Sequence, residues 1–161
     1  MVPKFRGRNI ETGEWVYGHL FYFDDGRHFI SPTGTDVVGG YGGAPAKYRL
    51  ENLVCFEIKP ETVGQSTGLK DKNGVDIFEG DVLLHTSSSV NYSDTYWHSY
   101  VQVYRMDSGA YRIKGKHIYD TELMSARNRI EVVGNIYQHQ NLLEKEYFST
   151  SDGIVVQANE N

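Results

Sequence analysis

The sequence predicts a mainly β protein, and three observations support this class. Trp15, Tyr17 and Phe21 lie on alternate positions of residues 15–23, which is the period of a strand. Short apolar runs are separated by turn signals such as Asn73-Gly74, the dipeptide most typical of a tight hairpin. Helical character is confined to residues 138–147, where we expect one short helix near the C-terminus. Aromatic residues make up 13% of the chain, and we expect them to supply core that helices do not.

The N-terminal part is expected to form an antiparallel meander. Its three strands are predicted at residues 4–10, 15–23 and 27–31, with polar, glycine-containing turns between them. Residues 32–45 are rich in glycine and predict a long loop. A further strand is expected at residues 52–58, and Pro60 ends it because proline cannot donate to a ladder.

The remainder predicts a second β unit that is punctuated by glycine. After the Asn73-Gly74 hairpin we expect a strand at 82–86, a polar loop at 87–94, a hairpin of 100–106 with 110–114, and a strand at 130–137. Gly134 lies inside that last strand, which indicates a bulge or a close backbone approach. The expected organisation is an N-terminal β region at 1–59, a C-terminal β unit at 60–147 and a tail at 148–161 that could add an edge strand to a neighbour.

Composition excludes some classes of function. The chain has 161 residues and a net charge of -5, from 16 Lys and Arg against 21 Asp and Glu. Proteins that bind nucleic acid through phosphates usually carry an excess of basic residues, so this charge disfavours such a role without excluding a local patch. Apolar runs are too short to cross a bilayer, and the charged start lacks the apolar core of a signal peptide. We therefore expect a protein of the cytoplasm that does not enter a membrane.

Motifs for catalysis, cofactors or metals are absent from the sequence pattern. The six histidines are dispersed without paired spacing, and a site assembled from distant His, Asp and Glu residues stays a minor alternative. Cys55, the single cysteine, lies in a predicted apolar strand, which favours core packing over nucleophilic chemistry. The glycines at 64 and 68 have the wrong spacing for a phosphate-binding loop. The sequence thus predicts no catalytic residue, cofactor or metal ligand.

One aromatic cluster and one basic cluster are candidates for an interaction surface. Aromatic rings beside a polar loop can stack on bases or anchor a protein partner, although filling of the small core is the favoured alternative for Trp97 and Tyr100. Basic side chains on the predicted 100–114 hairpin could follow a nucleic-acid backbone. The candidate residues are Tyr92, Tyr96, Trp97, Tyr100, Arg105, Arg112, Lys114 and Lys116.

Two long motifs carry a resemblance to a known family. Residues 60–82 read PETVGQSTGLKDKNGVDIFEGDV, and residues 130–137 read IEVVGNIY. Together with Lys4-Phe5-Arg6 and the WVYG of residues 15–18, they closely resemble the YopX family of phage and prophage proteins, over roughly residues 1–146. Two departures are visible: Ser66 replaces a usual aromatic residue, and residues 139–141 replace the usual Asn-Pro-Glu.

The resemblance implies a mainly β protein whose C-terminal region is similar to a small SH3-like barrel. It also implies a phage-encoded protein that acts in the host cytoplasm, and it supplies no catalytic residue, substrate or partner. Our leading hypothesis is a non-enzymatic accessory protein that binds a host or phage protein through a β edge or an aromatic face. The alternatives are a small barrel that binds nucleic acid and, third, a metal-dependent enzyme. Association of copies by strand addition also stays open.

Overall fold

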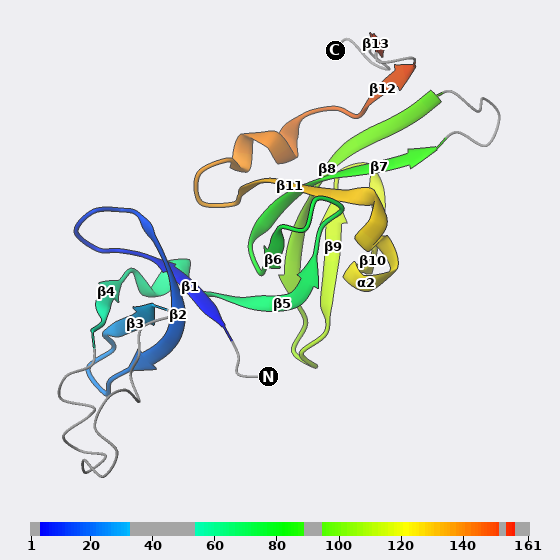
Figure 1. Cartoon of the computed structure of the whole chain (residues 1–161). Helices are drawn as coiled ribbons and strands as arrows, with labels where there is room; N and C mark the ends of the chain where they lie inside the picture. The colour runs from blue at the N-terminus through cyan, green and yellow to red at the C-terminus, as the bar shows by residue number, and fades with distance from the viewer. Residues whose placement is uncertain (1–3, 33–53, 89–94, 152–153, 157–161) are drawn as a thin grey trace. The chain divides into compact units, whose positions relative to one another are not determined.

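The computed structural model describes residues 4–32, 54–88 and 95–151, together with the backbone of 154–156 (Figure 1). The chain forms two compact units, Met1–Ser66 and Thr67–Asn161. Each unit is mainly antiparallel β, so the predicted fold class is confirmed at this level.

The first unit contains the predicted meander. Its strands are β1 (Phe5–Arg8), β2 (Trp15–Tyr22), β3 (His28–Pro32) and β4 (Phe56–Ile58), in the order β4-β3-β2-β1. After the 3₁₀ turn η1 (Pro60–Thr62), the strand β5 (Gly64–Lys70) begins beside β1 and continues into the second unit. The predicted strand at 52–58 is shorter than expected, because residues 54 and 55 precede β4.

Close packing holds this first unit together at Gly7 and Ile58. A Cβ at Gly7 would lie within van der Waals overlap of the Ile58 side chain, which is fully buried. Only glycine therefore lets β1 approach this core residue. Cys55 was expected in the core, and this expectation is wrong: the residue is exposed and lies before β4, whose first residue Phe56 is also exposed.

The second unit is built around two long central strands, β7 (Asp81–Ser88) and β8 (Thr95–Arg105). Its main sheet has the order β10-β9-β8-β12-β13, while β7 pairs with both β8 and β11. The other strands are β6 (Asp76–Phe78), β9 (Tyr111–Gly115), β10 (Ile118–Glu122), β11 (Ile130–Asn135), β12 (Phe148–Ser151) and β13 (Ile154–Val156). The short helix α2 (Leu123–Ala126) and the 3₁₀ turn η2 (Arg127–Arg129) connect β10 to β11.

The glycine-rich motif forms turns, as predicted. β5 and β6 are neighbours in a hairpin, and Gly74 adopts a positive φ of 82° in its turn. The carboxylate of Asp71 accepts the backbone N–H groups of Asn73 and Val75 and thereby closes this turn. Further along the motif, the buried Asp81 accepts the N–H of Phe78 at 2.7 Å. The polar motif residues therefore shape the backbone.

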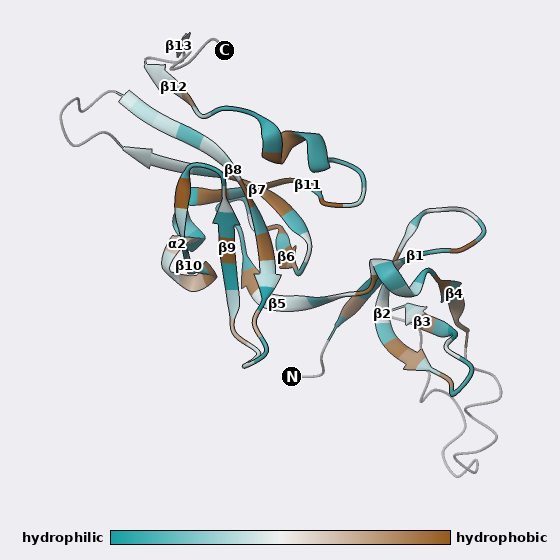
Figure 2. Ribbon diagram, turned by 180° about the vertical axis from the view of Figure 1, so that it is seen from behind, coloured by the Kyte–Doolittle hydropathy of each residue, from teal (hydrophilic) through white to brown (hydrophobic). Residues whose placement is uncertain are grey.

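The core of the second unit is aliphatic, not aromatic as expected. Its fully buried members are Ile77, Leu83, Val101, Val103, Ile113, Leu123, Ala126 and Ile130. In Figure 2 the apolar stretches lie where β7 pairs with β8 and β11, and the far ends of β7 and β8 are paler. Branched aliphatic side chains suit the crowded surface of paired strands, which leaves the larger rings for the periphery.

Among its described residues, the second unit has neither a closed sheet nor an α-helix near the C-terminus. Neither sheet closes over the described residues, so the SH3-like barrel is not confirmed. The expected helix at 138–147 is wrong: the structure has a 3₁₀ turn there, η3 (Gln140–Glu144), and the α-helix of the described residues is α2. The expected tail contributes β12, which pairs with β8, and β13. No helix of the described residues is long and apolar enough to cross a membrane.

Candidate functional site

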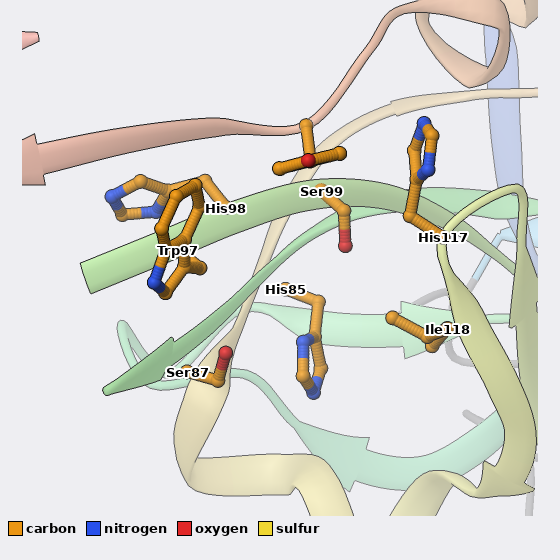
Figure 3. Close-up of a pocket in the computed structure, with 8 residues that line it drawn as sticks. His85, Ser87, Trp97, His98, Ser99, His117 and Ile118 are labelled. Carbon is orange, nitrogen blue, oxygen red and sulfur yellow. The ribbon is translucent and has the colours of Figure 1, made fainter. Parts of the chain in front are cut away.

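A pocket of about 350 Å³ opens in the second unit where β8 changes its neighbour. β9 ends at Gly115, opposite Val101, and β12 begins at Phe148, opposite His98. Between these points β8 lacks a described partner on this side at Ser99. The turn after β9 and the segment before β12 come together over the gap and form the pocket walls (Figure 3).

The pocket continues the core face of the sheet. Successive side chains of a strand alternate between its faces, so His85 and Ser87 share the face of the buried Leu83. On β8, Trp97 and Ser99 likewise share the face of Val101. Beyond the core the residues thus change from aliphatic to hydrogen-bonding and aromatic. The lining residues are His85, Ser87, Trp97, His98, Ser99, His117, Ile118 and Tyr147.

The floor holds two polar groups that face each other across the ladder. His85 on β7 is the direct partner of Ser99 on β8, and Ser99 is only 7% exposed. Within the described ranges, neither side chain makes a hydrogen bond. Burial, and secondarily the charge of Arg129, lowers the pKa of His85, so its imidazole is neutral at pH 7. The floor therefore offers an uncharged donor and acceptor set to an incoming group.

The walls are aromatic. The Trp97 ring lies 5.5 Å from the ring of Tyr147, tilted by 55°, and His117 meets the edge of Tyr147 at 4.9 Å. Trp97 remains 36% exposed, so neighbouring side chains do not cover its ring completely. Aromatic surfaces of this kind bind flat or apolar groups through area and ring geometry.

The carboxylate of Glu146 at the rim of the pocket is held in ion pairs. Glu146 lies 2.6 Å from the Lys116 ammonium and 3.0 Å from Nε2 of His117. The hydrogen bond from Lys116 is the main reason that the pKa of Glu146 is lowered, and the same contact raises the pKa of Lys116. This cluster ties the β9–β10 turn to the segment before β12 and leaves the pocket without an unbalanced carboxylate.

His98 fixes the strands beside the pocket. Its Nδ1 lies 2.9 Å from the Thr86 hydroxyl and its Nε2 lies 2.7 Å from the Thr150 hydroxyl, so one imidazole connects β7, β8 and β12. The ring also stacks on Phe148 at 4.9 Å. Burial, followed by the charge of Lys72, lowers the pKa of His98. Its part is thus to position β12, which Tyr147 directly precedes.

The chemistry of the pocket suits binding. Its lining has two π surfaces, neutral imidazole and hydroxyl groups, and an apolar side chain, which together fit an uncharged group with a flat surface and a polar edge. Among the described residues, no cluster of three or more His, Cys, Asp or Glu side chains could hold a metal ion.

The predicted aromatic residues separate in the structure. Trp97 lines the pocket, so its expected role in the core is wrong, because its end of β8 extends past the aliphatic cluster. Tyr96 is exposed, and Tyr100 is half-buried near Phe148 at 6.4 Å. Tyr92 lies outside the described residues.

The predicted basic residues do not form a free basic stripe. Arg112 donates to the carbonyl of Asp120, and the Lys114 ammonium lies 4.7 Å from the centre of the Tyr104 ring. Lys116 pairs with Glu146, as described above. Arg105 is exposed at the end of β8. Arg112 and Lys114 do share one face of β9, but local acceptors and rings already engage them.

Of the eight lining residues, the sequence pattern singled out only Trp97, and it missed His85, Ser99, His117 and Tyr147, which shape the floor and walls. His85 and Ser99 become partners only through the register of β7 and β8. The available signal was that polar residues, His85 and Ser99, follow or precede apolar residues in two strands. This signal does not indicate a site unless the register of the strands is known. Tyr147 and His117 meet through tertiary contacts that local spacing does not encode.

Comparisons with known proteins give one family match and a similar solved structure. The family model described as "YopX protein" matches residues 4–144. A crystal structure of protein EF1440 from Enterococcus faecalis is similar, with 23% identity and a TM-score of 0.49, over 89% of this chain and 99% of that chain. A comparison with curated proteins gives no significant match.

Proposed function

Because the chain belongs to the YopX family, and because its second unit carries an open aromatic pocket, we propose that it is a non-enzymatic accessory protein of a phage or prophage. It binds a protein of the host or of the phage, in the host cytoplasm, through this pocket. The residues of the two YopX motifs form turns and strand pairings, and none of them lines the pocket.

The observation that carries this proposal is the pair His85 and Ser99 beneath an exposed tryptophan. Sheet cores are normally completed by apolar side chains, because a buried polar group without a hydrogen bond costs about 1–3 kcal/mol. Here the core face ends instead in His85 and Ser99, which border the open pocket next to Trp97. Tryptophan in a partly enclosed pocket is typical of the residues that dominate binding energy at protein interfaces.

Binding of nucleic acid is the weaker alternative. Its four candidate cations include Arg112, Lys114 and Lys116, all three of which already have partners in the chain. The net charge of -5 adds long-range repulsion of phosphates. A stacked base could still use Trp97, so the test must separate the two kinds of partner.

The test compares three immobilised proteins: wild type, Trp97→Ala and Tyr119→Ala. Tyr119 is 96% exposed and does not line the pocket, so it is a matched aromatic control. Each is exposed to nuclease-treated lysate of host cells that carry the phage, and bound proteins are quantified by mass spectrometry. We expect at least one protein to bind wild type and Tyr119→Ala and to be lost with Trp97→Ala. Equal binding to all three, or binding only before nuclease treatment, would contradict the proposal.

A further inference from the structure

At its C-terminal end, β7 has no paired strand among the described residues on the side where β11 begins, although the turn η2 that leads into β11 contacts β7. β11 pairs with β7 only from Asp81 to His85, whereas β8 pairs with β7 as far as Ser88. In the part of the chain that the structure describes, no strand therefore lies beside Thr86–Ser88 on the side of β11. Figure 1 shows β7 and β8 extending past the point at which β11 begins.

An open edge presents backbone donors and acceptors that match another backbone. Backbone N–H and C=O groups point alternately to the two sides of a strand, so part of the Thr86–Ser88 backbone faces outward. An extended segment is the complement of such an edge, since it continues the line of pairing that β11 begins. Bases or phosphates do not supply this alternating pattern.

Resting on the binding function proposed above, we propose that the partner contributes an extended segment that adds as a strand to β7 at Thr86–Ser88 and places one uncharged aromatic side chain in the pocket. Directly opposed residues of paired strands have Cβ atoms about 5 Å apart on the same face. The partner residue opposite Ser87 thus lies on the pocket face. Its ring reaches Trp97, and its polar edge faces His85 and Ser99.

The charges at the site select an uncharged side chain. Glu146 is already paired with Lys116 and His117, so a cationic side chain would compete with existing contacts. An anionic side chain would lose hydration next to a neutral His85, which supplies no charge of its own. A flat side chain with a hydrogen-bonding edge satisfies both the walls and the floor.

The experiment uses the full chain and the partner identified by the capture described above. Ser87→Pro and Ser88→Pro each remove one backbone N–H; since N–H directions alternate, one of them points outward. Ser87→Ala and Ser88→Ala keep the backbone N–H, so each proline variant is compared with the alanine variant at the same position. We expect one proline variant to bind at least about tenfold more weakly than its alanine counterpart, the energy of roughly one hydrogen bond. Ser88 does not line the pocket, so Ser88→Ala should bind as wild type.

Amide hydrogen exchange of the wild-type complex gives a second readout that does not depend on the folding of any variant. We expect slower exchange at the outward amide of residue 87 or 88 on binding. Unchanged exchange at both amides, wild-type binding by both folded proline variants, or displacement of the partner by oligothymidylate would each overturn strand addition. If Trp97→Ala still loses the partner in those cases, pocket binding survives; if Trp97→Ala binds as wild type, the proposed function itself fails.

Discussion

The carboxylate of Asp71 accepts the backbone N–H of Val132 at 2.9 Å, across 61 positions of sequence. The same carboxylate holds the N–H groups of Asn73 and Val75 in the β5–β6 turn. One side chain of the YopX motif therefore fastens this turn to β11, which pairs with the pocket strand β7. This contact explains why an acid stands directly before the Lys72-Asn73-Gly74 turn.

Replacing Asp71 by alanine should destabilise the fold. Three backbone donors lose their acceptor, and each buried donor left unsatisfied costs about 1–3 kcal/mol. We expect a loss of about 2–4 kcal/mol in the free energy of unfolding, measured by urea denaturation. Asp76→Ala is the control, because its ion pair with Lys70 is surface exposed and should contribute about 0–1 kcal/mol. Equal effects of the two substitutions would show that Asp71 does not fasten the turn.

Asp71 should also make stability depend on acid. Burial by itself raises the pKa of this carboxyl, but the hydrogen bonds from Val132, Val75 and Asn73 outweigh it, and the pKa lies below 3.8. The unfolded chain therefore binds the proton more readily, so the stabilisation is present above pH 3.8 and is lost as pH falls through the folded pKa. The free energy of unfolding, measured at a series of pH values from 6 downward, should fall less steeply with acid in Asp71→Asn than in wild type. An equal fall in both proteins would show that Asp71 is not the cause of this pH dependence.

His85 and His98 should titrate below the ordinary histidine value of 6.5. Burial is the main cause of the lowered pKa of both groups. The unfolded chain then binds protons that the folded chain excludes, so each histidine makes stability fall as pH drops below 6.5. NMR titration of the ring carbon protons measures both values directly. A midpoint for His85 at or above 6.5 would mean that the pocket floor is charged more readily than its burial implies.

Gly134 should tolerate a side chain only when His139 is shortened. A Cβ at position 134 would lie 2.5 Å from Nδ1 of His139, and the register of β11 shifts between Val132 and Gly134, as the predicted bulge requires. Gly134→Ala should cost about 1–3 kcal/mol. In a His139→Ala background the same change should cost less, and a double-mutant cycle measures the difference. Additive costs would show that the ring and the glycine are independent.

Trp97 should matter less for stability than a buried aliphatic residue. Trp97→Ala removes a ring that is 36% exposed, and we expect a smaller loss than for a fully buried residue, because part of the ring area stays in water in the folded state. Leu83→Ala, in the fully buried core, should cost about 2–5 kcal/mol. Thermal or urea unfolding of both variants checks this order. The reverse order would return Trp97 to the core role that its sequence context suggested.

Much of the fold follows from local pattern. Alternating side chains in residues 15–23 and the Asn73-Gly74 turn each encode a short-range preference, and the meander and hairpin form as predicted. Gly134 was recognisable because glycine inside a strand indicates a bulge or a close contact. The predicted C-terminal helix is wrong: two leucines and neighbouring glutamates resemble one helical turn, and the structure forms only the 3₁₀ turn η3 there.

The pocket was decided by long-range pairing. The class, the turns and the family motifs could be deduced from sequence because each rests on residues a few positions apart. His85 reaches Ser99, and His117 reaches Tyr147, only after β7, β8, β9 and β12 take their register. Pairings across such distances depend on loop closure and on the competition among strands, which no local period records. The aromatic cluster thus could be noticed in the sequence, but its place at an open pocket follows from the tertiary structure.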